Sequence, residues 1–183
     1  CGSGPSCGYS RCERPEYMTG AIALTPITLA EHSADALDLA TRAADYVTLE
    51  IGYAPDETYV KDFFTVAPPD LGPGCLLHDA VMQGPAMVGM ICIAEGYEYP
   101  DDWWIGLMLI DPAFRNQSIG HSVVGMVKER AKRRKINMIK LAVLMANPRA
   151  LKFWHCEGFR HHRDAPATAS SDGHDRVVLK YQV

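Results

Sequence analysis

The sequence predicts a mixed α+β domain arranged around one sheet. Short apolar runs typical of strands alternate with segments whose apolar residues recur at helical spacing. The resulting order of elements is βααβββαβαβ, and no internal repeat interrupts it. Such an order favours helices packed on the faces of a single sheet.

The first half of the predicted domain contains one strand and two helices. Residues 21–27 form a short strand that ends near Pro26. Residues 29–49 carry apolar side chains at helical spacing, and residues 56–66 form a second helix that Pro68 and Pro69 stop. We therefore expect two helices between the first and second strands.

The second half of the domain is expected to contain most of the sheet. Two apolar runs flank the turn Gln83-Gly84-Pro85 and predict an antiparallel hairpin. The remaining segments follow in a regular order. They are strands at residues 75–82 and 86–94, a strand at 102–110, a helix at 119–135, a strand at 138–144, a helix at 148–157, a polar loop at 163–175 and a strand at 176–181.

The N-terminus differs in composition from the rest of the chain. Residues 1–20 are rich in Gly, Ser, Pro and Cys and lack periodicity, so we expect a poorly ordered extension followed by a single domain at residues 21–183. The three cysteines beyond the extension are expected to be buried thiols. A zinc site that uses Cys7 and Cys12 is the alternative, but four residues separate them and no second pair follows.

Composition excludes several classes of function. The net charge of −4 and the pI of about 6.0 give no overall basic field, so nucleic acid is not an expected partner. No apolar run has the ~18–20 residues of a membrane span, and no signal peptide opens the chain. A cytoplasmic location, without a membrane partner, is the default expectation. The basic run at residues 132–135 suits the negative end of a helix dipole.

One turn carries the chemical signal of the chain. Residues 111–121 follow an apolar strand and open a helix, where free backbone N–H groups and the helix dipole hold anions. Pro112 ends the strand, Arg115 places a cation at the mouth of the turn, and Gly120 allows close approach of chain or ligand. Taken alone, the turn is equally compatible with an ordinary strand–turn–helix junction.

A second segment, residues 147–159, has clear helix punctuation. Asn147 suits the N-cap and Pro148 the first helical position. Gly158 suits the left-handed residue that ends a helix, and Phe159 its hydrophobic partner.

Together the two segments resemble the GCN5-related N-acetyltransferase (GNAT) superfamily. The first family motif, Arg/Gln-x-x-Gly-x-Gly/Ala, is matched from Arg115 to Gly120. The second, Asn-x-x-Ala-x-x-aliphatic/aromatic-Tyr-x-x-x-Gly-Phe, is matched at Asn147, Ala150, Phe153, Gly158 and Phe159. The resemblance implies the GNAT fold, a central mixed and mostly antiparallel twisted sheet flanked by helices.

The resemblance also implies that the chain binds acetyl-CoA or another acyl-CoA. The strand before the turn would pair with the pantetheine arm, the turn would grip the pyrophosphate, and the second motif would contact the pantetheine. The positions expected to bind the coenzyme are Met108, Leu109, Ile110, Arg115, Asn116, Gln117, Ser118, Ile119, Gly120, His121, Asn147, Phe153 and Trp154.

Two of these positions depart from the family pattern. Ser118 stands where the family usually has Gly, so its side chain either crowds the pyrophosphate or donates to it; a helical backbone there would tolerate Ser. Trp154 stands where many members have a tyrosine that protonates the departing thiolate, and an indole has no acidic proton. Water, His155, Tyr97 or Tyr99 are the alternative proton donors.

The positions where the family places a general base also carry other residues. Trp104 and Ala142 occupy the two positions where members of the family place a Glu, so Asp102 and Glu95 are the candidate bases. Asp102, Trp104 and Gly106 share a face by strand alternation. Trp104 and Tyr97 are expected to wall the acceptor pocket.

The resemblance therefore implies an N-acyltransferase. An acetyl group would move from acetyl-CoA to a primary amine of a small molecule or peptide, by direct attack in a ternary complex and without a metal. A non-catalytic acyl-CoA-binding sensor or partner subunit is the alternative. Dimers are common in the family, so a homodimer is one expectation for the assembly.

Overall fold

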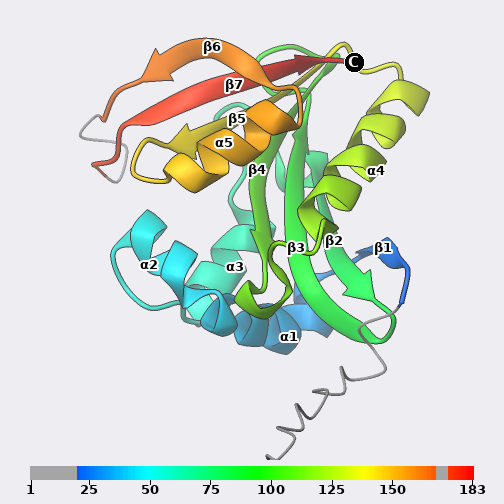
Figure 1. Ribbon diagram of the computed structural model, residues 1–183, viewed down its shortest axis with the longest axis vertical. Helices are drawn as coiled ribbons and strands as arrows, with labels where there is room; N and C mark the ends of the chain where they lie inside the picture. Colours follow the sequence, from blue (N-terminus) through cyan, green and yellow to red (C-terminus); the bar gives the residue numbers. More distant parts are fainter. Residues whose placement is uncertain (1–19, 168–172) are drawn as a thin grey trace, which may run out of the picture.

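A computed structural model describes residues 20–167 and 173–183; apart from Gly20, the predicted N-terminal extension lies outside the described residues. Seven strands form one mixed sheet in the order β1-β2-β3-β4-β5-β7-β6, in which only the β4–β5 pair is parallel (Figure 1). The strands are β1 Ile22–Pro26, β2 Leu76–Gln83, β3 Ala86–Glu95, β4 Asp102–Ile110, β5 Met138–Leu144, β6 Arg160–Ala165 and β7 Arg176–Gln182. The predicted mixed, mostly antiparallel sheet is confirmed.

Helices cover both faces of the sheet. They are α1 Leu29–Arg42, α2 Ala44–Ile51, α3 Glu57–Thr65, α4 Ile119–Arg133 and α5 Pro148–Cys156, with short 3-10 turns η2 Pro73–Cys75 and η3 Pro112–Phe114. One core joins α4 and α5 to the sheet around the fully buried Trp103 and Phe159. A second core joins α1, α2 and α3 to the opposite face around Leu39 and Met90.

The parallel strands β4 and β5 pair over only part of their length. Their register runs from Asp102 opposite Met138 to Ile105 opposite Leu141 and then stops. Beyond Ile105 the two strands separate, so the last part of β4 faces a gap rather than a neighbouring strand. This split is the feature that creates the site described below.

A β-bulge at Gly106 lies where the split begins. Cys92 of β3 pairs with Leu107 and the next residue, Ile93, pairs with Ile105, so Gly106 is the extra residue in β4. A bulge reverses the facing of the residues that follow it. Trp103 and Ile105 accordingly lie in the α4–α5 core, whereas Leu109 lies in the α1–α3 core. The predicted alternation along β4 therefore does not continue past Gly106.

Two predictions about secondary structure are wrong. The helix predicted at residues 29–49 is two helices that meet at Ala43, because apolar spacing is the same on both sides of the break and does not reveal it. Residues 163–165, predicted as loop, belong to β6. This edge strand, RHHRDA, is exposed along almost its whole length, so it has no apolar alternation to detect.

The thiols beyond the extension are less buried than expected. Cys92 is buried, but Cys75 is half-buried and Cys156 is exposed. Among the described residues, none of the helices combines the length and the apolar character needed to cross a membrane.

Candidate active site

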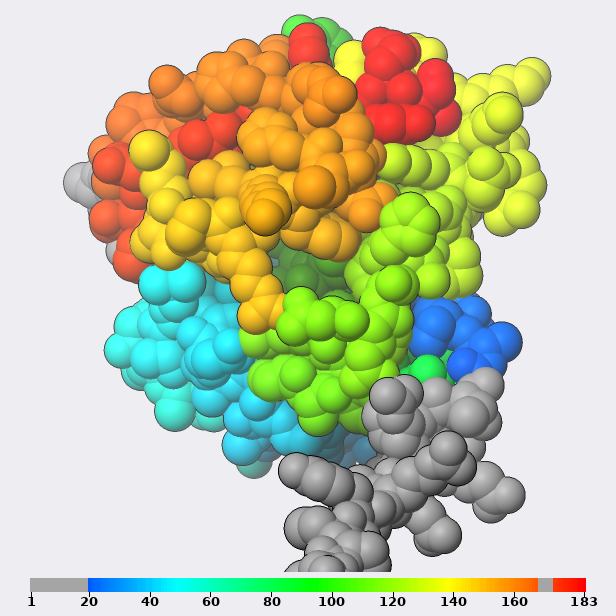
Figure 2. All heavy atoms as spheres, viewed as in Figure 1, coloured from blue at the N-terminus to red at the C-terminus, as the bar shows by residue number. Residues whose placement is uncertain are grey.

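A cleft of about 610 Å³ occupies the split between β4 and β5. Its walls are the end of β4, the turn before α4, the inner face of α5 and the start of α2. Figure 2 shows the hollow between α5, the turn at residues 115–120 and α2. Of the thirteen positions expected to bind a coenzyme, all except Gln117 line this cleft.

The turn before α4 has an unusual backbone. Asn116 and Ser118 have left-handed φ values of 61° and 62°. Ser118 therefore does not have the helical backbone that would tolerate its side chain without strain. Ser118 is the N-cap of α4, and its side chain makes no capping hydrogen bond. The first amides of a 15-residue helix, together with the positive end of its dipole, consequently face the cleft mouth.

Hydrogen bonds hold the turn in shape. Asp111 Oδ1 accepts from the Ala113 amide at 2.8 Å, and Asp111 Oδ2 accepts from Arg42 Nε at 2.6 Å. Gln117 Nε2 donates to the Ala113 carbonyl at 2.9 Å, which explains why this side chain points away from the cleft. The turn is thus fixed before any ligand arrives.

Arg115 has partners within the protein. Its Nε donates to the Ile110 carbonyl at 2.9 Å, and its guanidinium grips both carboxylate oxygens of Asp45. The hydrogen bond from Arg115 is the main cause of a lowered pKa at Asp45. Arg115 lines the cleft, but its charge is committed to joining the turn to α2.

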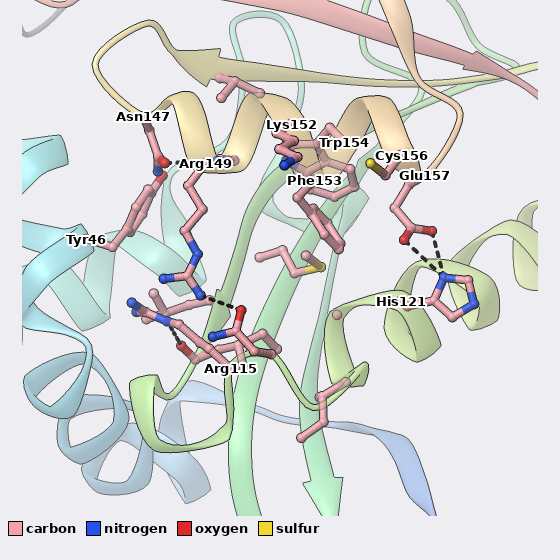
Figure 3. Close-up of a pocket in the computed structure, with 18 of the residues that line it drawn as sticks. Tyr46, Arg115, His121, Asn147, Arg149, Lys152, Phe153, Trp154, Cys156 and Glu157 are labelled. Carbon is pink, nitrogen blue, oxygen red and sulfur yellow. Dashed lines mark hydrogen bonds and ion pairs between the residues drawn. The ribbon is translucent and has the colours of Figure 1, made fainter.

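Two cations of α5 lie at the cleft mouth instead. Arg149 donates to Asn116 Oδ1 at 3.0 Å, and Lys152 follows one turn later on the same helix (Figure 3). Both side chains line the cleft and both residues are exposed. They add positive charge to the wall opposite the N-terminus of α4.

The rim beside α4 is closed by a polar contact. His121 Nδ1 lies 3.0 Å from Glu157 Oε1 (Figure 3). Lys128 Nζ donates to the Glu157 carbonyl at 2.5 Å. These contacts join the first and third turns of α4 to the end of α5. They leave the cleft open between His121 and Arg149.

The predicted punctuation of α5 is confirmed. Asn147 Oδ1 accepts from the Ala150 amide at 3.0 Å, and Gly158 has a left-handed φ of 87°. Trp154 is buried, and its ring stands edge-on to Phe153 and Phe159. At the position of the missing tyrosine the cleft is therefore walled by an aromatic core residue without an acidic proton.

The structure does not bring the two candidate bases to the cleft. Asp102 is the first residue of β4, six residues from Met108, and a strand of that length spans about 20 Å. Its carboxylate lies 2.7 Å from Lys140 Nζ. Glu95 is paired with Arg134 of the α4 C-cap. Neither carboxylate lines the cleft, and each is already neutralised by a cation.

The expected acceptor wall and proton donors also lie elsewhere. Tyr97 and Trp104 stack edge-on with ring centroids 5.2 Å apart, and neither lines the cleft. Tyr99 is 64% exposed near Lys140, and His155 Nδ1 lies 3.1 Å from the Phe159 carbonyl. None of these four residues is among those that line the cleft.

Sequence reasoning missed the contribution of α2. Asp45, Tyr46 and Leu49 line the side of the cleft that α2 forms, although no motif marks them. Figure 3 shows Tyr46 pointing toward Asn147. Within residues 20–167 and 173–183, no group of three or more His, Cys, Asp or Glu side chains could hold a metal ion.

The fold observed here is an open mixed sheet that splits at its parallel strand pair, beside a helix N-terminus. The family comparison is more specific. The model of the Acetyltransferase (GNAT) family matches residues 40–159, which is more than half of the chain. The chain belongs to this family.

Solved structures agree on the fold. An acetyltransferase from Thermus thermophilus superposes with a TM-score of 0.71 at 19% identity, over 88% of this chain and 97% of the other. A probable GNAT acetyltransferase from Chromobacterium violaceum gives 0.71 at 18% identity, over 100% and 95%. The ribosomal-protein-S18-alanine N-acetyltransferase from Escherichia coli gives 0.63 at 12% identity, over 88% and 94%. At these identities the likeness concerns the fold alone. No curated protein sequence matches the chain.

Proposed function

We propose that this protein is an acyl-CoA-dependent N-acyltransferase that moves an acetyl group from acetyl-CoA to a primary amine of a small molecule or peptide. The observation that carries the proposal is the cleft itself. It joins an exposed strand edge to a helix N-terminus, and cations lie across its mouth. Coenzyme A has the matching parts, a chain of amides that ends in phosphates.

The residues present fit such a substrate. Met108, Leu109 and Ile110 pair with β3 but have no β5 partner, so the backbone groups on their β5 side are open to the pantetheine arm, apart from the Ile110 carbonyl, which accepts from Arg115. The pyrophosphate would lie at the amides from Asn116 to His121, where the helix dipole favours negative charge. Arg149 and Lys152 would contribute charge-assisted contacts to the phosphates.

The chemistry follows from this placement. The amine nitrogen attacks the thioester carbonyl, a C–N bond forms, and the C–S bond breaks to release the thiolate. Oxygen charge develops at the carbonyl, and amides of β4 near the bulge at Gly106 are suited to stabilise it. Holding both reactants in one cleft supplies much of the rate enhancement. The amine must attack in its neutral form, and its proton passes to water.

Calorimetry and a thiol-release assay test the proposal together. We expect acetyl-CoA to bind in the micromolar range and CoA to be released with at least one of phenethylamine, spermidine or a tetrapeptide with a free N-terminus. Arg149→Glu, which places an anion opposite the phosphates, tests the site and should weaken the binding of acetyl-CoA. Release of CoA by this variant at the wild-type rate would show that acetyl-CoA does not bind in this cleft.

One set of substitutions favours a second candidate. Trp104, Ala142 and Trp154 stand at positions where various members of the family have acid–base residues. Tight binding of acetyl-CoA without release of CoA, either to these amines or to water, would favour a non-catalytic acyl-CoA sensor.

A further inference from the structure

Helix α2 places a phenol on the side of the cleft that it forms. Tyr46 lines the cleft together with Leu49 of α2, Leu109 of β4 and Leu144 of β5. Its side chain points toward Asn147, the N-cap of α5 (Figure 3). Tyr46 therefore stands where the split strands, α2 and α5 converge.

A carboxylate holds this phenol in place. Tyr46 Oη donates to Glu50 Oε1 at 3.3 Å, one helical turn further along α2. The Tyr59 phenol of α3 belongs to the same group: burial first, and then the charge of Glu50, raise the pKa of Tyr59. Tyr59 is thus kept neutral, and among the two phenols only Tyr46 lines the cleft.

None of the proton donors expected from the sequence lines the cleft, and the ionisable side chains of His121, Lys152 and Cys156 line it from α4 and the later turns of α5, away from Tyr46 (Figure 3). A departing thiolate of ordinary pKa, about 8.5, is stabilised by a donor such as a phenol, whose ordinary pKa is about 10. Trp154 has no acidic proton, and His155, Tyr97 and Tyr99 do not line the cleft. Beside Tyr46 the cleft is lined by the apolar side chains of Leu49, Leu109 and Leu144 and by the Asn147 amide, which has no acidic proton.

We propose that Tyr46 is a catalytic residue that gives its phenolic proton to the CoA thiolate as the C–S bond breaks. This inference rests on the proposed N-acyltransferase function. The electron pair of the C–S bond stays on sulfur, the phenol proton completes the thiol, and Tyr46 is reprotonated by water. The amine proton leaves separately to water. Glu50 is a positioning residue: its carboxylate accepts the phenol's hydrogen bond in the free protein, and the Tyr46 hydroxyl turns from Glu50 to the sulfur as the thiolate forms.

The test is Tyr46→Phe, with Tyr53→Phe as the matched control. Tyr53 follows α2 directly, is 57% exposed and does not line the cleft, so it loses the same hydroxyl outside the site. We expect Y46F to lower kcat by roughly 100-fold or more with little change in the KM or Kd of acetyl-CoA, and Y53F to match the wild type. If no amine of the panel reacts, the slow hydrolysis of acetyl-CoA is measured instead, because the same C–S bond breaks.

The pH dependence of kcat distinguishes a catalytic role of Tyr46 from a structural one. The charged and titratable groups near Tyr46 are Glu50, Tyr59 and, toward the cleft mouth, Asp45, Arg115 and Arg149. In the wild type we expect kcat to fall on the basic side as the phenol ionises, and Y46F to lack this fall. Glu50→Gln removes a negative charge beside the phenol, so the fall should move to lower pH.

The outcomes are distinct. A Y46F enzyme that keeps the wild-type kcat and the wild-type basic limb overturns the role of Tyr46 but leaves the proposed function standing. A wild-type protein that binds acetyl-CoA and never releases CoA overturns the proposed function, and the inference with it. Thermal melts of Y46F and Y53F should match, so a fall in the Y46F rate is not a loss of fold.

Discussion

Arg149 of α5 donates a hydrogen bond to the Asn116 side chain across the mouth of the cleft, at 3.0 Å. The contact joins a helix to a turn that lies 33 residues earlier in the chain. Asn116 is held in a left-handed conformation, and the turn is fixed from its other side by Arg115 and Asp45. Arg149 therefore occupies the place where a phosphate would meet the turn.

Arg149→Ala should weaken the binding of CoA about tenfold. A phosphate can replace Asn116 as the partner of this guanidinium, and a hydrogen bond to a charged group is worth about 1.5 kcal/mol. Calorimetry at low and moderate salt checks the value, because the loss should shrink as salt screens the contact.

Arg133→Ala is the control for Arg149→Ala. Arg133 is exposed at the last position of α4 and does not line the cleft, so the same charge is lost at a distance. We expect R133A to bind CoA like the wild type. Equal losses in R133A and R149A would mean that net charge, rather than the contact at the turn, governs binding. A loss in R133A alone would point to the basic run as the phosphate site.

Gly120→Ala should loosen the packing of α4 against α5. A Cβ at Gly120 would lie 3.1 Å from Phe153 Cζ, so the ring must shift within the cleft. We expect a loss of about 1 kcal/mol in the free energy of unfolding and a several-fold weaker binding of CoA. Gly125→Ala, in the same helix with nothing within 4 Å, should instead stabilise the protein by about 0.5–1 kcal/mol. Urea unfolding compares the two variants.

Ser118→Gly should preserve or improve the affinity for acyl-CoA. Ser118 has a left-handed φ of 62°, a conformation that glycine adopts without steric cost. The resulting gain in folding stability is partly offset because glycine makes the unfolded chain more flexible. Ser122→Gly, one turn into α4, is the matched control and should destabilise the protein by about 0.5–1 kcal/mol. A large loss of acyl-CoA affinity in S118G alone would show that the Ser118 hydroxyl binds the ligand.

The sequence predicts the coenzyme side of the cleft well because its signals are local. Asn147, Gly158 and the turn at residues 111–121 have conformations that neighbouring residues determine, through caps, left-handed positions and a helix start. The residues that line this side lie within about 50 positions of one another. Local rules did not reveal the break at Ala43 or the bulge at Gly106, since neither changes the apolar spacing around it.

The acceptor side depends on contacts that are distant in the chain. Tyr46 and Asp45 reach the cleft only because Arg115 and Arg42 hold the turn against α1 and α2. Asp102 and Glu95 resemble free carboxylates in the sequence, yet Lys140 and Arg134 neutralise them in the fold. Strand alternation predicts the face of a side chain, but it does not predict which charge lies opposite.

Lys140 offers a test of which charges lie opposite one another in the fold. It lies in the apolar strand β5, its side chain is 4% exposed, and its Nζ lies 2.7 Å from Asp102 and 2.9 Å from Glu98. Burial acts against the charged form of Glu98, but hydrogen bonds from Lys140 and Arg163 outweigh it, so the pKa of Glu98 is lowered. These ion pairs therefore stabilise the fold above the ordinary pKa of a glutamate, and their contribution is lost as the pH falls through the lowered value.

Lys140→Met should destabilise the protein by about 3 kcal/mol at pH 7, because Asp102 is left buried without a cation. The difference from the wild type should narrow as the pH falls through the lowered pKa of Glu98. Lys180→Met is the control: Lys180 lies opposite Lys140 across β5 and β7 but makes no ion pair with any residue that the structure describes, so its loss should cost less than about 1 kcal/mol. Urea unfolding at pH 7 and pH 3.5 measures both effects. If Asp102 were instead a general base, K140M would change the pH dependence of kcat. We expect that pH dependence to stay the same. We also expect Asp102→Asn, combined with K140M, to recover part of the lost stability.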